Sequence, residues 1–177
     1  MRLEVRIARR YAKALADVLP DEKLGKVNEE IKTLISLLDD RAIRYFKSPV
    51  VSLEKKKGLM EQILEKVGVS KELKKVLLLM AQKDRLGIVK EFASEFEKFV
   101  DLRLGIVKAE IISAVEMDDE TLSKIREKIE SLFGKKAEIT VKLDPSLIGG
   151  FIVKVADKVL DASIKTQLEM LKKTIAD

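Results

Sequence analysis

The stretch Gly105-Ile-Val-Lys-Ala-Glu-Ile-Ile-Ser-Ala-Val115 separates two patterns of apolar residues. From Val107 to Val115, every second residue is apolar or small, which is the period of a half-buried strand. The apolar runs that precede it repeat instead at the three- and four-residue spacing of helices. The sequence therefore predicts a helical unit over residues 1–105 and a small α+β unit over residues 106–177.

Upstream of this stretch, six segments carry an apolar stripe at helical spacing. Pro20 and the Ser48-Pro49 pair interrupt the pattern, Gly68 is a typical helix end, and Ser52 and Ser70 are expected to cap the helices that follow them. The connections are short and contain no strand signal, so we expect a compact six-helix antiparallel bundle. The predicted helices cover approximately residues 5–19, 21–38, 43–46, 53–67, 73–81 and 86–103.

Downstream, residues 137–143 alternate as a second strand, and residues 151–155 and 158–160 form two more strands that turn at 156–157. Between the first two strands, Asp118 caps a helix whose apolar face carries Leu122, Ile125, Ile129 and Leu132. A final helix is striped by Ile164, Leu168, Leu171 and Ile175. The expected fold class is mostly α, a helical bundle followed by a small α+β domain.

Composition limits the possible functions. Hydrophobic residues make up 46% and charged residues 37% of the chain, which is typical of folded amphipathic elements rather than a disordered tail. The net charge of +5 is a small difference between 35 basic and 30 acidic residues that are interleaved along the chain. Because aromatic residues are only 5% and Trp is absent, a basic helical nucleic-acid-binding module is the alternative function rather than the first.

The chain contains no His and no Cys, which removes the commonest general base and the commonest nucleophile. It also lacks the glycine-rich loops that bind nucleotide phosphates, so no cofactor is expected. Ser52 and Lys55 match the spacing of a Ser/Lys hydrolase, but a Ser directly after a proline break is ordinarily a helix cap. No secretory signal begins the chain and no apolar stretch approaches the roughly 20 residues that span a bilayer, so direct membrane insertion is not expected.

The fifth predicted helix is unusual because apolar residues surround most of its circumference. One side carries Leu73, Val76, Leu77 and Met80, whereas Leu78 and Leu79 point elsewhere. One explanation is that this helix lies at the centre of the bundle. The other is that its second side, together with the alanine-rich first helix (Ala8, Ala12, Ala14 and Ala16), forms a groove for a partner helix.

Several motifs resemble the delta subunit family of F-type ATP synthases, whose mitochondrial counterpart is the oligomycin-sensitivity-conferring protein. The resemblance lies in Ile7-Ala-Arg-Arg-Tyr-Ala-Lys-Ala-Leu15, Phe46-Lys-Ser-Pro49, Met80-Ala-Gln-Lys-Asp-Arg-Leu86, Asp144-Pro-Ser-Leu-Ile-Gly-Gly150 and Val159-Leu-Asp-Ala-Ser-Ile-Lys165. There are departures: Asp84, Ala156 and Ala162 stand where the family usually has glycine, and Lys154 and Lys165 where arginine is common.

The resemblance implies a non-catalytic stator subunit that links the catalytic head to the peripheral stalk. The N-terminal helix of an alpha subunit would bind the groove formed by Ile7, Tyr11, Ala14, Val18, Lys75, Val76 and Leu79. Residues 106–177 would meet the b subunits, and the C-terminal motif residues are Asp144, Gly149, Gly150, Asp161 and Ser163. For these glycines we expect a structural role, and for Asp161 and Ser163 a cap on the last helix. The protein would be a single copy within a hetero-oligomeric complex, peripheral to the cytoplasmic face of the inner membrane.

Overall fold

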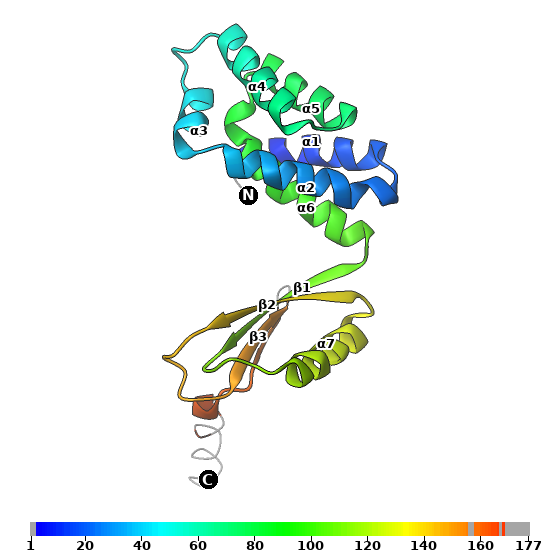
Figure 1. Cartoon of the computed structure of the whole chain (residues 1–177), viewed down its shortest axis with the longest axis vertical. Coiled ribbons are helices and arrows are strands. Elements are labelled where there is room, and N and C mark those ends of the chain that lie inside the picture. Colours follow the sequence, from blue (N-terminus) through cyan, green and yellow to red (C-terminus); the bar gives the residue numbers. More distant parts are fainter. Residues whose placement is uncertain (1–2, 156–157, 167, 169–177) are drawn as a thin grey trace. The chain divides into compact units, whose positions relative to one another are not determined.

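The computed structural model describes residues 3–155, 158–166 and 168, and its fold is mostly helical with a small mixed four-stranded sheet. Contacts divide the chain into two compact units, Met1–Leu104 and Gly105–Asp177 (Figure 1).

The first unit contains six α-helices and one short 3₁₀ turn. The predicted start of the sixth helix at Leu86 is wrong. The chain first forms the 3₁₀ turn η1 (Leu86–Ile88), and the α-helix starts at Val89. The α-helices are α1 (Leu3–Val18), α2 (Asp21–Leu37), α3 (Asp40–Lys47), α4 (Leu53–Val67), α5 (Lys71–Gln82) and α6 (Val89–Arg103).

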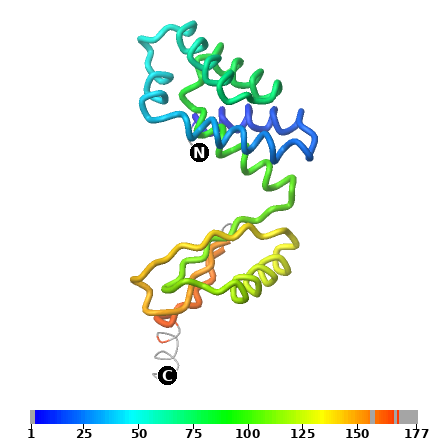
Figure 2. Tube along the Cα trace, in the orientation of Figure 1, coloured from blue at the N-terminus to red at the C-terminus, as the bar shows by residue number. Residues whose placement is uncertain are grey.

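Helix α1 packs most extensively against α6, and the two lie side by side in Figure 2. Ala8, Ala12 and Ala16 are four residues apart and fully buried, so small side chains line the face that α1 turns into the unit. At the end of α6, Arg103 donates a hydrogen bond to the Leu19 carbonyl (3.2 Å) and pairs with Asp21. Of the four alanines interpreted as room for a partner, only Ala14 is exposed, because the unit's own core covers the others.

Two of the predicted helix signals around α4 are confirmed and one is wrong. The Ser52 hydroxyl accepts a hydrogen bond from the Lys55 N–H (3.4 Å), and Gly68 ends α4 with a left-handed φ of 69°. Ser70 occupies the N-cap position of α5, but its hydroxyl makes no capping bond and is buried without a hydrogen-bond partner. The Glu30 carboxylate accepts the Ser70 backbone N–H instead (2.8 Å), which ties α2 to the start of α5.

Helix α5 ends in a Schellman turn with Asp84 in the left-handed position, at φ 53°. The Arg85 N–H donates to the Met80 carbonyl (2.8 Å) and the Asp84 N–H to the Ala81 carbonyl (3.0 Å), as that motif requires. Glycine is the usual residue at this position. The Asp84 carboxylate accepts a hydrogen bond from Nζ of Lys56 (2.6 Å), whose side chain on α4 is only 2% exposed. Asp84 therefore supplies the partner of a buried lysine.

We predict that Asp84→Gly destabilises the first unit although it relieves backbone strain. Glycine in the left-handed turn should raise the free energy of unfolding by about 1 kcal/mol. Leaving the buried Lys56 ammonium without its carboxylate partner should lower it by about 1.5–3 kcal/mol. The double variant Asp84→Gly/Lys56→Met should be at least as stable as the wild type in urea unfolding. A single Asp84→Gly variant that unfolds at a higher urea concentration than the wild type would contradict this account.

In the described part of the second unit, a four-stranded sheet has helix α7 on one face (Figure 1). The strand order is β2-β1-β3-β4, with β1 parallel to β2 and antiparallel to β3. Alternate residues Val107, Ala109 and Ile111 of β1 are buried and pack with Ile129 of the helix. The elements are β1 (Ile106–Ser113), α7 (Asp119–Phe133), β2 (Lys136–Leu143), β3 (Phe151–Val155) and β4 (Lys158–Asp161).

The second unit differs from the sequence predictions at the end of β1 and on the buried face of α7. Strand β1 ends at Ser113, so Val115 does not continue the alternation and is 69% exposed. Leu132 is 61% exposed and Phe133 packs on the core instead, because at about 100° per residue Phe133 lies nearer the middle of the helix face. The expected turn at 156–157 and the positions Leu171 and Ile175 lie outside the described residues.

The sheet face opposite α7 is polar around the middle of β1. Glu110 pairs with Lys142 on β2 and with Lys154 on β3 (3.8 Å). Strand β2 is an edge of the sheet and carries Lys136, Glu138 and Lys142 on exposed positions. These charges oppose pairing of the edge with another strand.

Candidate partner-binding surfaces

The residues expected to form the groove lie on α1 and α5, which contact each other. Ala14, Val18, Lys75 and Leu79 are exposed, and the Val18 side chain is 71% accessible. The other three residues are half-buried and pack against the core: Ile7, Tyr11 and Val76.

Helix α5 is not enclosed on all sides. Leu73 and Leu77 are fully buried, whereas Leu78 is half-buried and Leu79 is 44% exposed. The first explanation for its apolar circumference, a place at the centre of the bundle, therefore does not account for Leu79.

A small cavity of about 190 Å³ lies between the first two turns of α1, the end of α3 and the segment 84–88 that follows α5. The Arg85 guanidinium reaches from the end of α5 to α1 and donates a hydrogen bond to the Tyr11 hydroxyl (3.4 Å). Ile7, Phe46 and Ile88 provide apolar walls, and charged side chains of Glu4, Lys47, Asp84 and Arg85 also line the cavity. Sequence reasoning did not select Arg85 as a site residue, although it lies in a motif that carried the resemblance.

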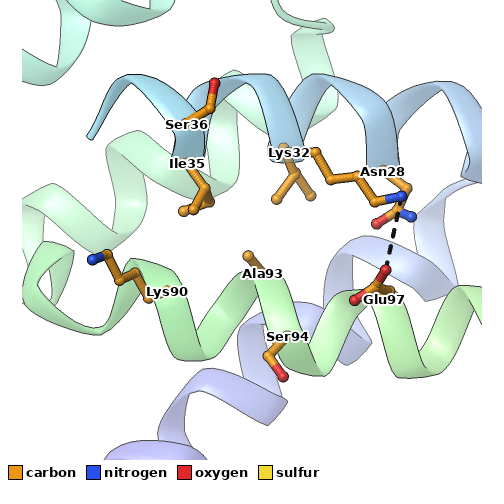
Figure 3. A pocket seen from close by; sticks show the side chains of 9 residues that line it. Asn28, Lys32, Ile35, Ser36, Lys90, Ala93, Ser94 and Glu97 are labelled. Atoms are coloured by element: carbon orange, nitrogen blue, oxygen red, sulfur yellow. Dashed lines mark ion pairs between the residues drawn. The ribbon is translucent and has the colours of Figure 1, made fainter. Parts of the chain in front are cut away.

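A second, larger pocket of about 390 Å³ lies between α2 and α6 and was not expected from the sequence. Its apolar floor includes Ile31, Ile35 and Ala93, and the Lys32 ammonium and the Glu97 carboxylate pair across it at 3.8 Å (Figure 3). The small side chain of Ala93 faces Ile35 and leaves this space open (Figure 3). The one sequence feature that indicates this pocket is Ala93, a small residue within the apolar stripe of α6.

The C-terminal motif residues form a polar junction at the ends of the strands. The Gly149 carbonyl accepts the Ile164 N–H (3.0 Å), and the backbone of Gly150, at φ 80°, passes against Ala162. A Cβ at Gly150 would lie impossibly close to the Ala162 carbonyl oxygen and 3.0 Å from the Ser163 Cα. Gly150 is thus required by both a positive φ and a close backbone approach, whereas a Cβ at Gly149 would meet only the flexible side chain of Ile164.

Asp144, Asp161 and Ser163 hold the loops of this junction. Asp161 accepts hydrogen bonds from the Ser163 N–H (2.8 Å) and the Thr166 hydroxyl (2.8 Å). The Ser163 hydroxyl accepts the Thr166 N–H (3.4 Å), which is the expected cap of the following helical turn. Asp144 makes a local turn in which it accepts the Ser146 N–H (3.0 Å), while its own N–H bonds to the Ser113 carbonyl (2.9 Å).

These hydrogen bonds lower the pKa of the Asp161 carboxyl below its ordinary value of 3.8, with Ser163 the main cause and Thr166 a further one. The pKa of Asp144 is lowered by Ser146 in the same way. Because the folded pKa is depressed, the stabilisation is present above pH 4 or so and is lost as the pH falls through the lowered values. The junction therefore keeps its contacts at neutral pH.

We predict that Gly150→Ala destabilises the second unit much more than Gly134→Ala. Both glycines have positive φ, but Gly134 at 63° has open space around its Cα, whereas Gly150 abuts Ala162. Alanine in this conformation costs roughly 1 kcal/mol at either site, and the clash adds about 1–3 kcal/mol at Gly150. Hydrogen exchange of β1 and β3 amides measures the difference, and equal losses in the two variants would contradict the close approach.

The described residues contain no group of His, Cys, Asp or Glu side chains that could hold a metal ion. Within the same part of the chain, no helix is long and apolar enough to cross a membrane.

A helical unit joined to a small α+β unit, with exposed apolar residues on α1 and α5, is typical of a protein that binds other proteins. A sequence model of the ATP synthase delta (OSCP) subunit family matches residues 7–175, and the chain belongs to this family. It is accordingly a stator or coupling subunit of an ATP synthase, with a structural rather than an enzymatic role.

Curated relatives agree over nearly the whole chain. The ATP synthase subunit delta of Desulfotalea psychrophila is 37% identical over 172 residues, which cover 96% of this chain and 95% of that protein. The ATP synthase subunit delta of Desulfosudis oleivorans is 36% identical over 172 residues, covering 96% and 94%. A chain in the cryo-EM structure of the Toxoplasma gondii mitochondrial ATP synthase hexamer has the same fold, with a TM-score of 0.67, 18% identity and coverage of 100% and 99%.

Proposed function

We propose that this protein links the N-terminal helix of an alpha subunit in the catalytic head to the b subunits of the peripheral stalk. In this role it holds the head still against the torque of the rotor, which requires stiff contacts at both ends and no reaction of its own. The six helices of residues 3–103 then act as one antiparallel bundle that carries the load. The protein works at the cytoplasmic face of the inner membrane as a peripheral subunit.

The observation that carries the alpha-subunit contact is the exposure of Leu79 on α5 beside α1. Together with Ala14 and Val18, it leaves apolar surface uncovered on two adjacent helices. An amphipathic helix binds such a surface by placing its apolar face between the two helices. Ile7, Tyr11 and Val76 form the half-buried floor, and Lys75 lies at the rim.

The second unit is the proposed contact for the stalk. Apolar side chains remain exposed near the C-terminal junction, including Leu143 at 53%, Leu160 at 53% and Ile164 at 42%. The tight packing of Gly149 and Gly150 against the segment 162–164 fixes the backbone from which Ile164 projects. A stiff junction with exposed apolar side chains suits a contact that must resist force.

We predict that Leu79→Asp abolishes tight binding of a peptide with the sequence of the alpha-subunit N-terminus from the same organism. A carboxylate desolvated under the docked helix costs about 3 kcal/mol, which corresponds to roughly a 100-fold higher Kd. Titration calorimetry with the full-length chain measures the change.

Leu102→Asp is the matched control because Leu102, on α6, is also exposed, at 65%, and lines a cavity on a different face of α1 with Val5 and Arg9. This control should bind the peptide like the wild type, and both variants should still bind the soluble part of the b subunits. Unchanged peptide affinity in a folded Leu79→Asp protein would rule out the α1 and α5 surface.

A further inference from the structure

Arg85 is placed by the backbone turn that ends α5. Its N–H completes that turn on the Met80 carbonyl, and the left-handed Asp84 directs the chain back toward α1. The Arg85 side chain is exposed, and within the described residues its one side-chain hydrogen bond is the long contact to the Tyr11 hydroxyl at 3.4 Å. Most of the donor capacity of this guanidinium, which has five N–H groups, is therefore unused by the chain.

Three other charged residues line the cavity with Arg85: Asp84, Lys47 and Glu4. The Asp84 carboxylate is paired with the buried Lys56, so it is directed to α4. The Lys47 stem lies over Gly87, where an added Cβ would come within 2.5 Å of the Lys47 Cγ. Gly87 thus leaves room for a second cation, Lys47, in the wall of the cavity that Arg85 lines. Glu4, from the first turn of α1, is the remaining acidic residue there.

We propose that Arg85 and the Tyr11 hydroxyl together bind a carboxylate side chain of the helix that docks on α1 and α5. This inference rests on the proposed function, because it assigns a specific anchor to the same surface. Tyr11 accepts its hydrogen bond from Arg85, so the phenol proton is available to a partner. A guanidinium and a hydroxyl 3.4 Å apart can each donate to one of the two oxygens of a carboxylate, and charge-assisted bonds of the guanidinium are strong and directional.

The charge of the surrounding surface favours an acidic partner. Exposed basic side chains flank the surface on both helices: Arg6, Arg10 and Lys13 on α1, and Lys71 and Lys75 on α5. The acidic residues of these two helices are fewer: Glu4 and Asp17 are exposed on α1, and Glu72 on α5 already faces Lys23 at 3.9 Å. We therefore expect the docked helix to be amphipathic, with acidic residues beside its apolar stripe.

The position of Arg85 gives the docked helix a direction. Arg85 and Ile7 line the same cavity, at one end of the surface, whereas Val18 lies three turns further along α1. The apolar residues between these ends do not distinguish the two orientations of a bound helix. One carboxylate held at the Ile7 end would fix both orientation and register.

Titrations of the full-length protein with the alpha-subunit N-terminal peptide test this anchor. Arg85→Gln should raise the Kd about 10- to 50-fold, Tyr11→Phe about 3- to 10-fold and Arg85→Lys by an intermediate factor, since lysine keeps the charge without the fork. Arg41→Gln, on the exposed side of α3 and outside the docking surface, is the matched loss of one charge and should change the Kd less than threefold. Neutralising each Asp and Glu of the peptide in turn should identify one position whose effect disappears in Arg85→Gln.

The outcomes separate this inference from the proposed function. If the wild type binds the peptide and Leu79→Asp does not, but Arg85→Gln behaves like Arg41→Gln, the docking surface is supported and the anchor is wrong. The same conclusion follows if no acidic position of the peptide is coupled to Arg85. If the wild-type protein does not bind the peptide, the proposed function fails first. Tyr11→Phe leaves the backbone turn untouched, so it tests the anchor even if an Arg85 variant unfolds.

Discussion

The packing of α1 against α6 through small side chains is the contact on which the helical unit depends. Ala8, Ala12 and Ala16 are buried with almost no exposed surface, so larger side chains there would push the helices apart. Arg103 closes the far end by binding the turn between α1 and α2. Because this face of α1 is buried in the core, Ala14 and Val18 on its other side remain exposed.

The two units achieve rigidity by different means. The helical unit relies on a large apolar core with a few cross-links between helices, such as Glu30 to Ser70 and Lys56 to Asp84. The α+β unit has a much smaller core and fixes its C-terminal junction by backbone contacts around Gly150 and by short hydrogen bonds to Asp161. Both arrangements suit a subunit whose task is to transmit force without changing shape.

Sequence periodicity was sufficient to predict most helices and strands, because amphipathic stripes and alternation follow directly from which face is buried. It was not sufficient where a neighbour from elsewhere in the chain decides the outcome. The N–H of Ser70 is bound by Glu30 from α2 rather than by a local side chain, and three of the four alanines of α1 are buried in the unit. The apolar circumference of α5 was accessible to pattern analysis, and the proposed groove residues came from the resemblance to a family. Arg85 and the pocket beside Ala93 depend instead on tertiary contacts between distant residues.

The charged residues along β2 affect how readily the protein aggregates before it joins its partner subunits. A subunit made separately from its partners spends time in solution with apolar surfaces uncovered, and an open strand edge at such a moment invites stacking of one copy on another. Lys136, Glu138 and Lys142 make that stacking unfavourable without affecting the helix-covered face. The charged edge of β2 thus opposes aggregation of the unassembled chain until partner subunits cover its exposed apolar surfaces.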